Sequence, residues 1–130
     1  MDAVGESGRR VAREDTPQRL CLLEELPFGG ARGFDPWQTG EDSLVVLRRG
    51  AAVRAYHNRC PHQWSRLEYR KDRFLSADGQ HVICYAHGAH FDPDTGGCIH
   101  GACLGQSLRT VPCWTEHGWV WVHVRREVIP

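Results

Sequence analysis

Residues 57–91 read HNRCPHQWSRLEYRKDRFLSADGQHVICYAHGAHF and contain two short clusters of metal-binding side chains. Cys60 and His62 form the first cluster, and Cys84 and His87 form the second. Side chains two positions apart share a face of an extended segment but not of a helix, and the proline between the first pair also disfavours a helix. The first pair is therefore predicted on a loop or an extended segment, and two such loops together would offer two thiolates and two imidazoles to a metal.

Two kinds of metal centre accept such a ligand set. Four ligands could close a tetrahedral zinc site, but structural zinc modules usually keep like ligands together in C-x2-4-C and H-x3-5-H pairs. Here each half repeats the order of Cys followed by His, with spacings C-x-H and C-x2-H. A repeated order favours a binuclear centre in which two cysteines bind one iron and two histidines bind the other.

With these motifs the chain resembles a Rieske-type 2Fe-2S protein of the small soluble ferredoxin kind. It has the family's C-x-H and C-x2-H-G motifs at a suitable separation, and residues 90–97, HFDPDTGG, are similar to the family's segment after the second ligand pair. The resemblance runs from about residue 20 to residue 124. It implies one 2Fe-2S cluster per chain, with Cys60, His62, Cys84 and His87 as the cofactor-binding and metal-ligating residues.

The rest of the chain has the pattern of an all-β fold. Short apolar or alternating segments at 20–23, 44–47, 51–56, 81–85, 107–114 and 119–124 are separated by turn residues, which is typical of an antiparallel sandwich or small barrel. The family resemblance implies the same fold, with two cluster-binding loops at one tip. Residues 65–74 are compatible with one local helix, and residues 68–78 are interpreted as an insertion of unknown role.

Composition predicts a single domain. The 130 residues, 41% of them hydrophobic, suffice for one modest core but not for a second catalytic domain. Residues 1–19 are polar and lack an apolar run, so we expect a flexible tail at 1–19 and the Rieske 2Fe-2S domain at 20–130. Because this segment has no signal-peptide pattern, the cytoplasm is the expected location. In that reducing compartment, the six cysteines are expected to bind metal or to remain free thiols, and not to form disulfides.

Residues beside the ligand motifs indicate a low reduction potential within the family. Respiratory relatives carry a Ser and a Tyr after the second histidine, whose hydroxyls stabilise the reduced cluster, and here these positions are Ala89 and Phe91. Those relatives also connect the two ligand loops by a disulfide. The matching residues here are Ser65 and Ala86, which cannot form one. Residues 101–103 replace a Pro-containing loop that covers the cluster in relatives, so a looser cover is expected.

The remaining cysteines are expected to be small buried apolar side chains and not ligands, because they have no partner at ligand spacing. The sequence assigns no further role to these four, which are Cys21, Cys98, Cys103 and Cys113. In both motifs the His follows the Cys, and the predicted strands anchor the loops from the Cys side. We therefore expect the thiolates to face the core and the imidazoles of His62 and His87 to face solvent.

The resemblance implies one-electron transfer, and the expected partners are a flavin reductase and an oxygenase or related redox enzyme. Alternatives are an accessory small subunit, such as that of a nitrite reductase, a redox sensor, and a zinc-binding interaction module. No substrate site is expected, so the chain is interpreted as an electron carrier or a component of a redox enzyme. The 16 basic and 16 acidic residues cancel, and neither nucleic acid nor a membrane is expected as a partner.

Overall fold

The computed structural model describes residues 16–61, 65–68 and 70–124 of the chain. Within these residues ten strands form three antiparallel sheets, and the helical structure is one 3-10 turn, η1 (Leu23–Glu25). The predicted all-β class is therefore confirmed. No helix in these ranges is long and apolar enough to span a membrane.

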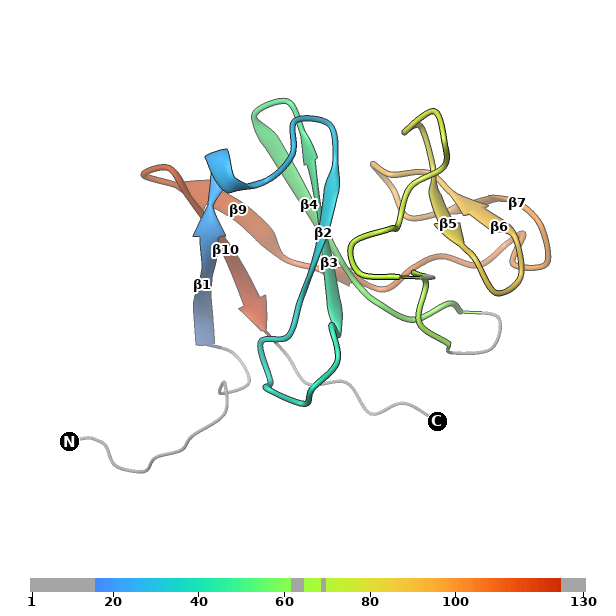
Figure 1. Ribbon diagram of the computed structural model, residues 1–130, viewed down its shortest axis with the longest axis horizontal. Coiled ribbons are helices and arrows are strands. Elements are labelled where there is room, and N and C mark those ends of the chain that lie inside the picture. Colours follow the sequence, from blue (N-terminus) through green and yellow to red (C-terminus); the bar gives the residue numbers. More distant parts are fainter. Residues whose placement is uncertain (1–15, 62–64, 69, 125–130) are drawn as a thin grey trace.

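The three sheets stand beside one another, with the largest in the middle (Figure 1). The first sheet has the order β1 (Thr16–Leu22), β10 (Trp119–Val124), β9 (Cys113–Glu116). The central sheet has the order β2 (Ala31–Phe34), β3 (Leu44–Arg49), β4 (Ala52–His57), β8 (Thr110–Val111). The third and smallest sheet has the order β5 (Val82–Cys84), β6 (Ala89–Phe91), β7 (Cys98–His100).

Strand β3 lies between two hydrophobic cores. Successive side chains of a strand point to opposite faces, so Leu44 and Val46 pack into the core shared with the first sheet. Val45 and Leu47 pack into the core shared with the third sheet. All four side chains are fully buried, which explains why the sequence shows a continuous apolar run here and no alternation.

Two tight connections bring the metal-binding motifs to the folded domain. The expected hairpin around residues 48–50 joins β3 to β4, and Gly50 adopts a φ of 66° in its turn. Strand β4 then runs directly into the first motif, while β5 and β6 hold the second motif between them. Each motif is thus anchored by a strand at its Cys end.

The local helix considered for residues 65–74 is not formed by the residues described there. Peptide groups of this segment make long-range hydrogen bonds instead. The amide of Leu67 donates to the side-chain oxygen of Asn58 at 2.8 Å, and the carbonyl of Leu67 accepts from the amide of Tyr85 at 3.0 Å. The Leu67 carbonyl is a group that a helix would pair with a later amide, so here a tertiary hydrogen bond takes the place of a helical one.

Two expected boundaries differ from the structure. Strand β1 begins at Thr16, four residues before the domain start expected at residue 20, because Thr16 to Arg19 pair along β10. Residues 1–15 of the expected tail lie outside the described residues. The strand expected at 107–114 is two strands, since Pro112 lacks an amide hydrogen and separates β8 in the central sheet from β9 in the first sheet.

Candidate metal centre

The first motif is held by the side chain of Asn58, which is fully buried directly after β4. Its amide nitrogen donates to the carbonyl of Asp42 at 2.8 Å and to the carboxylate of Glu68 at 2.9 Å. Its oxygen accepts from the Leu67 amide at 2.8 Å. One side chain thus connects the start of the ligand loop to two other segments.

Cys60 follows two residues later, and its position is set by the backbone. The amide of Cys60 donates to the carbonyl of Ser65 at 2.7 Å, which closes the loop between them. His62, the other predicted ligand of this motif, lies in residues 62–64, outside the described residues. The Ser65 hydroxyl is buried and has no hydrogen-bond partner among the described groups. An orphaned buried hydroxyl beside a ligand loop is what an absent group with acceptor atoms would leave.

The second motif forms the tight turn between β5 and β6. The amides of His87 and Gly88 both donate to the carbonyl of Cys84, at 3.3 Å and 2.7 Å. Gly88 adopts a φ of 71°, which lets the chain reverse into β6 without strain. The turn brings the Sγ of Cys84 to 3.6 Å from the Nδ1 of His87.

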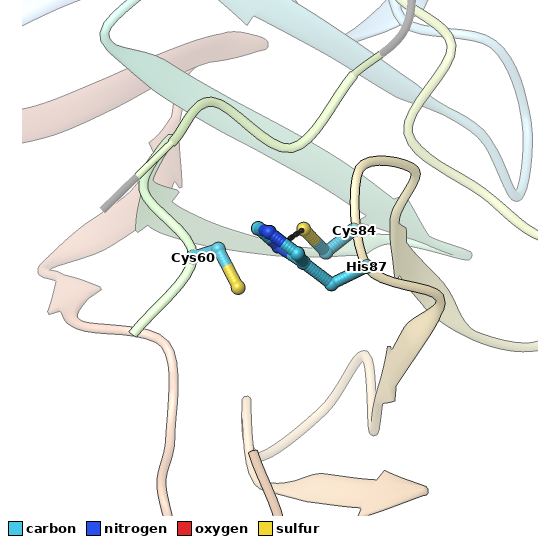
Figure 2. A group of neighbouring side chains, drawn as sticks. All are labelled: Cys60, Cys84 and His87. Atoms are coloured by element: carbon cyan, nitrogen blue, oxygen red, sulfur yellow. Dashed lines mark hydrogen bonds between the residues drawn. The ribbon is translucent and has the colours of Figure 1, made fainter. Parts of the chain in front are cut away.

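The two motifs converge on one point (Figure 2). The hydrogen bond from the Tyr85 amide to the Leu67 carbonyl ties the second turn to the first loop. Ligand atoms of Cys60, Cys84 and His87 lie within 4.8 Å of one another. Three of the four predicted ligands are therefore brought together by chain segments more than twenty residues apart.

The three ligands that the structure describes have the expected orientation, with the thiols toward the core and the imidazole nearer to solvent. Cys60 and Cys84 are fully buried, whereas His87 is half-buried. Burial raises the pKa of the Cys84 thiol, and the neighbouring Cys60 thiol raises it further. Buried thiols of this kind ionise readily only against a positive charge such as an iron ion, which couples metal binding to proton release.

The residues that follow the second motif offer apolar neighbours. Ala89 and Phe91 are fully buried in β6, and Phe91 shares its core with both cysteines. Neither side chain carries a hydroxyl. A different polar group lies next to a predicted ligand, because the Sγ of Cys103 is 3.6 Å from the Sγ of Cys60.

The resemblance places residues 101–103 where relatives have a loop over the cluster, but the Cys103 thiol was assigned no role because it has no partner at ligand spacing. All six cysteines are free of disulfides. Cys21 and Cys103 are buried as expected, while Cys98 and Cys113 are half-buried. Burial raises the pKa of Cys113 to about 12, in keeping with an apolar role. Cys103 lies 3.6 Å from the predicted ligand Cys60, and no spacing in the sequence indicates that these two thiols meet.

The fold and the Cys and His constellation define an iron–sulfur domain, and comparison with known families agrees. Residues 16–121 match the model of the family described as "Rieske [2Fe-2S] domain", and the chain belongs to this family. Its cofactor is therefore a 2Fe-2S cluster, and not the single zinc ion that the same ligand types could hold. The sulfur and nitrogen donors at the centre fit that group.

Solved ferredoxins have the same fold over most of their length. The ferredoxin of carbazole 1,9a-dioxygenase from Nocardioides aromaticivorans IC177 is 26% identical with a TM-score of 0.65, covering 82% of this chain and 96% of that one. The Sphingomonas yanoikuyae B1 ferredoxin is 26% identical with a TM-score of 0.62, covering 82% and 97%.

A curated relative is much longer than the region it shares with this chain. The oxygenase component of chloroacetanilide N-alkylformylase from Rhizorhabdus wittichii is 33% identical over 84 residues. The match covers 60% of this chain but only 22% of that protein. The match therefore concerns the Rieske region alone.

Proposed function

We propose that this chain is a one-electron carrier whose cluster is bound by Cys60, His62, Cys84 and His87. The observation that supports this assignment best is the convergence of Cys60, Cys84 and His87 from two separate loops. His62 completes the set by its place in the C-x-H motif. In the bound cluster two thiolates hold one iron and two imidazoles hold the other.

The protein's contribution is the environment of these ligands. A 2Fe-2S cluster with two thiolates and two neutral imidazoles passes single electrons, at about −150 to +300 mV compared with about −400 mV for plant-type ferredoxins. Cys60 and Cys84 are shielded from water, while half-buried His87 leaves one side of the site near the surface. Electrons are therefore proposed to enter and leave on the histidine side.

The proposed partners are a flavin reductase as donor and an oxygenase or related redox enzyme as acceptor. Support comes from the ferredoxin of a carbazole dioxygenase, which the chain matches over nearly that protein's whole length. Six cysteines without a disulfide support a reducing location, and we propose the cytoplasm.

Substitution of each proposed ligand tests the assignment. Cys60→Ser, Cys84→Ser, His62→Ala and His87→Ala should each lose the iron and the visible absorption, because a missing ligand opens the centre. Cys98→Ser is the matched control, since its thiol donates to the carbonyl of His100 instead. Full iron content in any ligand variant would contradict the assignment at that position.

Reconstitution tests the carrier role. The holoprotein is mixed with NADH and a flavin-containing ferredoxin reductase, and bleaching of the cluster is followed in a stopped-flow spectrometer. An oxygenase component is then added with substrate and oxygen, and product is measured with and without the holoprotein. A carrier is reduced quickly, reoxidised by the oxygenase and required for turnover. If dithionite reduces the cluster but none of the reductases does, an accessory subunit or a sensor is favoured instead.

A further inference from the structure

We propose that the thiol of Cys103 donates a hydrogen bond to the Sγ of Cys60 and thereby raises the reduction potential of the cluster. This inference rests on the proposed function, because it takes Cys60 as a cluster ligand. The two sulfur atoms are 3.6 Å apart, and either could donate in the metal-free chain. A ligating Cys60 carries no proton on sulfur, so Cys103 must then be the donor.

Cys103 lies beside the ligands and not among them. The group of mutually close ligand atoms contains Cys60, Cys84 and His87 but not Cys103. Its thiol contacts the sulfur of Cys60 without belonging to that group, so it can act on this sulfur without binding iron. Cys103 is therefore a positioning and tuning residue in this proposal.

The loop at residues 101–105 holds this thiol in place. Gly101 adopts a φ of 104°, and a Cβ built there would lie 2.9 Å from the Cα of Ala89, so the loop packs directly on β6. The Gln106 amide donates to the Cys103 carbonyl at 2.8 Å, and the Gln106 carbonyl accepts from the Cys98 amide at 2.9 Å. The loop is thus bonded to β7 and packed on β6, next to the second motif.

Burial makes this hydrogen bond matter for the potential. Both Cys60 and Cys103 are fully buried, so water does not compete for the ligand sulfur. Reduction adds one negative charge to the cluster, part of which resides on its sulfur ligands. A donor to such a sulfur stabilises the reduced state more than the oxidised state, and hydrogen bonds to sulfur are among the factors that set cluster potentials.

Replacing the donor should therefore lower the midpoint potential. We expect Cys103→Ala to decrease the equilibrium constant for reduction about five-fold, which is about 40 mV at 59 mV per tenfold change. Cys103→Ser keeps a donor and should stay nearer the wild type. Cys21→Ala removes a buried thiol from the other core and serves as the control.

A second measurement follows the thiol itself and not the potential. In the infrared difference spectrum between the oxidised and reduced wild type, the S–H stretching band should move to lower frequency on reduction, and it should vanish in Cys103→Ser. Equal midpoints in wild type, Cys103→Ala and Cys21→Ala, or a difference spectrum without a thiol band, would overturn the proposal. Loss of the cluster in Cys103→Ala with retention in Cys60→Ser would overturn it too, by making Cys103 the ligand. Absence of a 2Fe-2S cluster from the wild type would instead refute the proposed function.

Discussion

The thiols and the imidazole at the centre differ in their access to water. Cys60 and Cys84 lie at the strand ends of their motifs and are fully buried, while His87 lies in the turn between β5 and β6 and is half-buried. In the second motif, the Cys side chain is therefore buried and the His side chain that follows it is more exposed to solvent. In the proposed cluster, this arrangement would place the histidine-bound iron nearer to the surface.

Hydroxyl groups are missing from β6, and this determines the first prediction. We expect a wild-type midpoint near the lower end of the Rieske range, on the order of −150 mV, because Ala89 and Phe91 offer no donor. Introducing Ala89→Ser and Phe91→Tyr together should raise the midpoint in a dye-mediated redox titration. Ala89→Val with Phe91→Leu is the control without hydroxyls. A wild-type value above roughly +100 mV would show that other groups dominate the potential.

At this scale, sequence reasoning could find residues that share a motif but not residues that meet through the fold. The spacing of Cys60, Cys84 and His87 was enough to predict that they belong together, and the structure places them together. Cys103, whose sulfur lies 3.6 Å from that of Cys60, is contributed by a loop 43 positions away. Only the packing of that loop on β6 brings the two sulfurs close.

Among the connecting segments, the loop after β4 depends on Asn58. We expect Asn58→Ala to destabilise the apoprotein by about 2 kcal/mol, because it leaves the Leu67 amide and the Asp42 carbonyl without their buried partner. Loss of iron should also be faster on challenge with a chelator. Thermal unfolding and chelator kinetics measure the two effects. An unchanged melting temperature with unchanged iron retention would mean that the loop is held by other bonds.

The loop at residues 101–105 offers a matched pair of glycines. Gly101 and Gly105 both have a positive φ, so alanine at either position costs about 1 kcal/mol of backbone strain. Gly101→Ala also forces a Cβ against the Cα of Ala89, whereas a Cβ at Gly105 meets nothing within 4 Å. We expect Gly101→Ala to be the more destabilising by roughly 1–3 kcal/mol in denaturant unfolding. Equal losses would show that the loop does not pack tightly on β6.

Strands were predictable where side-chain patterns were strong, and boundaries were not. The alternating run that became β10 and the apolar run that became β3 were both predicted as strands and are strands. The helix considered at 65–74 failed because the Leu67 peptide groups bond to Asn58 and Tyr85, which no local pattern reveals. The break at Pro112 could have been foreseen from its missing amide hydrogen.

For the molecule as a whole, the cluster end of the third sheet is the expected docking surface. Leu104 lies in the loop next to Cys103 and is 64% exposed, as an apolar contact for a transient partner would be. We expect Leu104→Gln to slow reduction by the reductase several-fold at limiting concentration while leaving the midpoint unchanged. Phe28→Gln is the control, because Phe28 is 80% exposed between η1 and β2. Equal rates in both variants would place the contact elsewhere.

We propose that two loops of this chain bind one cluster through mixed Cys and His ligation. The most direct test of this proposal is EPR spectroscopy of the dithionite-reduced protein after anaerobic purification, together with iron and sulfide analysis of the same sample. We predict about two irons and two sulfides per chain and an average g value lower than that of a 2Fe-2S cluster with four cysteine ligands. Stoichiometric zinc without iron, or the average g value of a four-cysteine cluster, would contradict it.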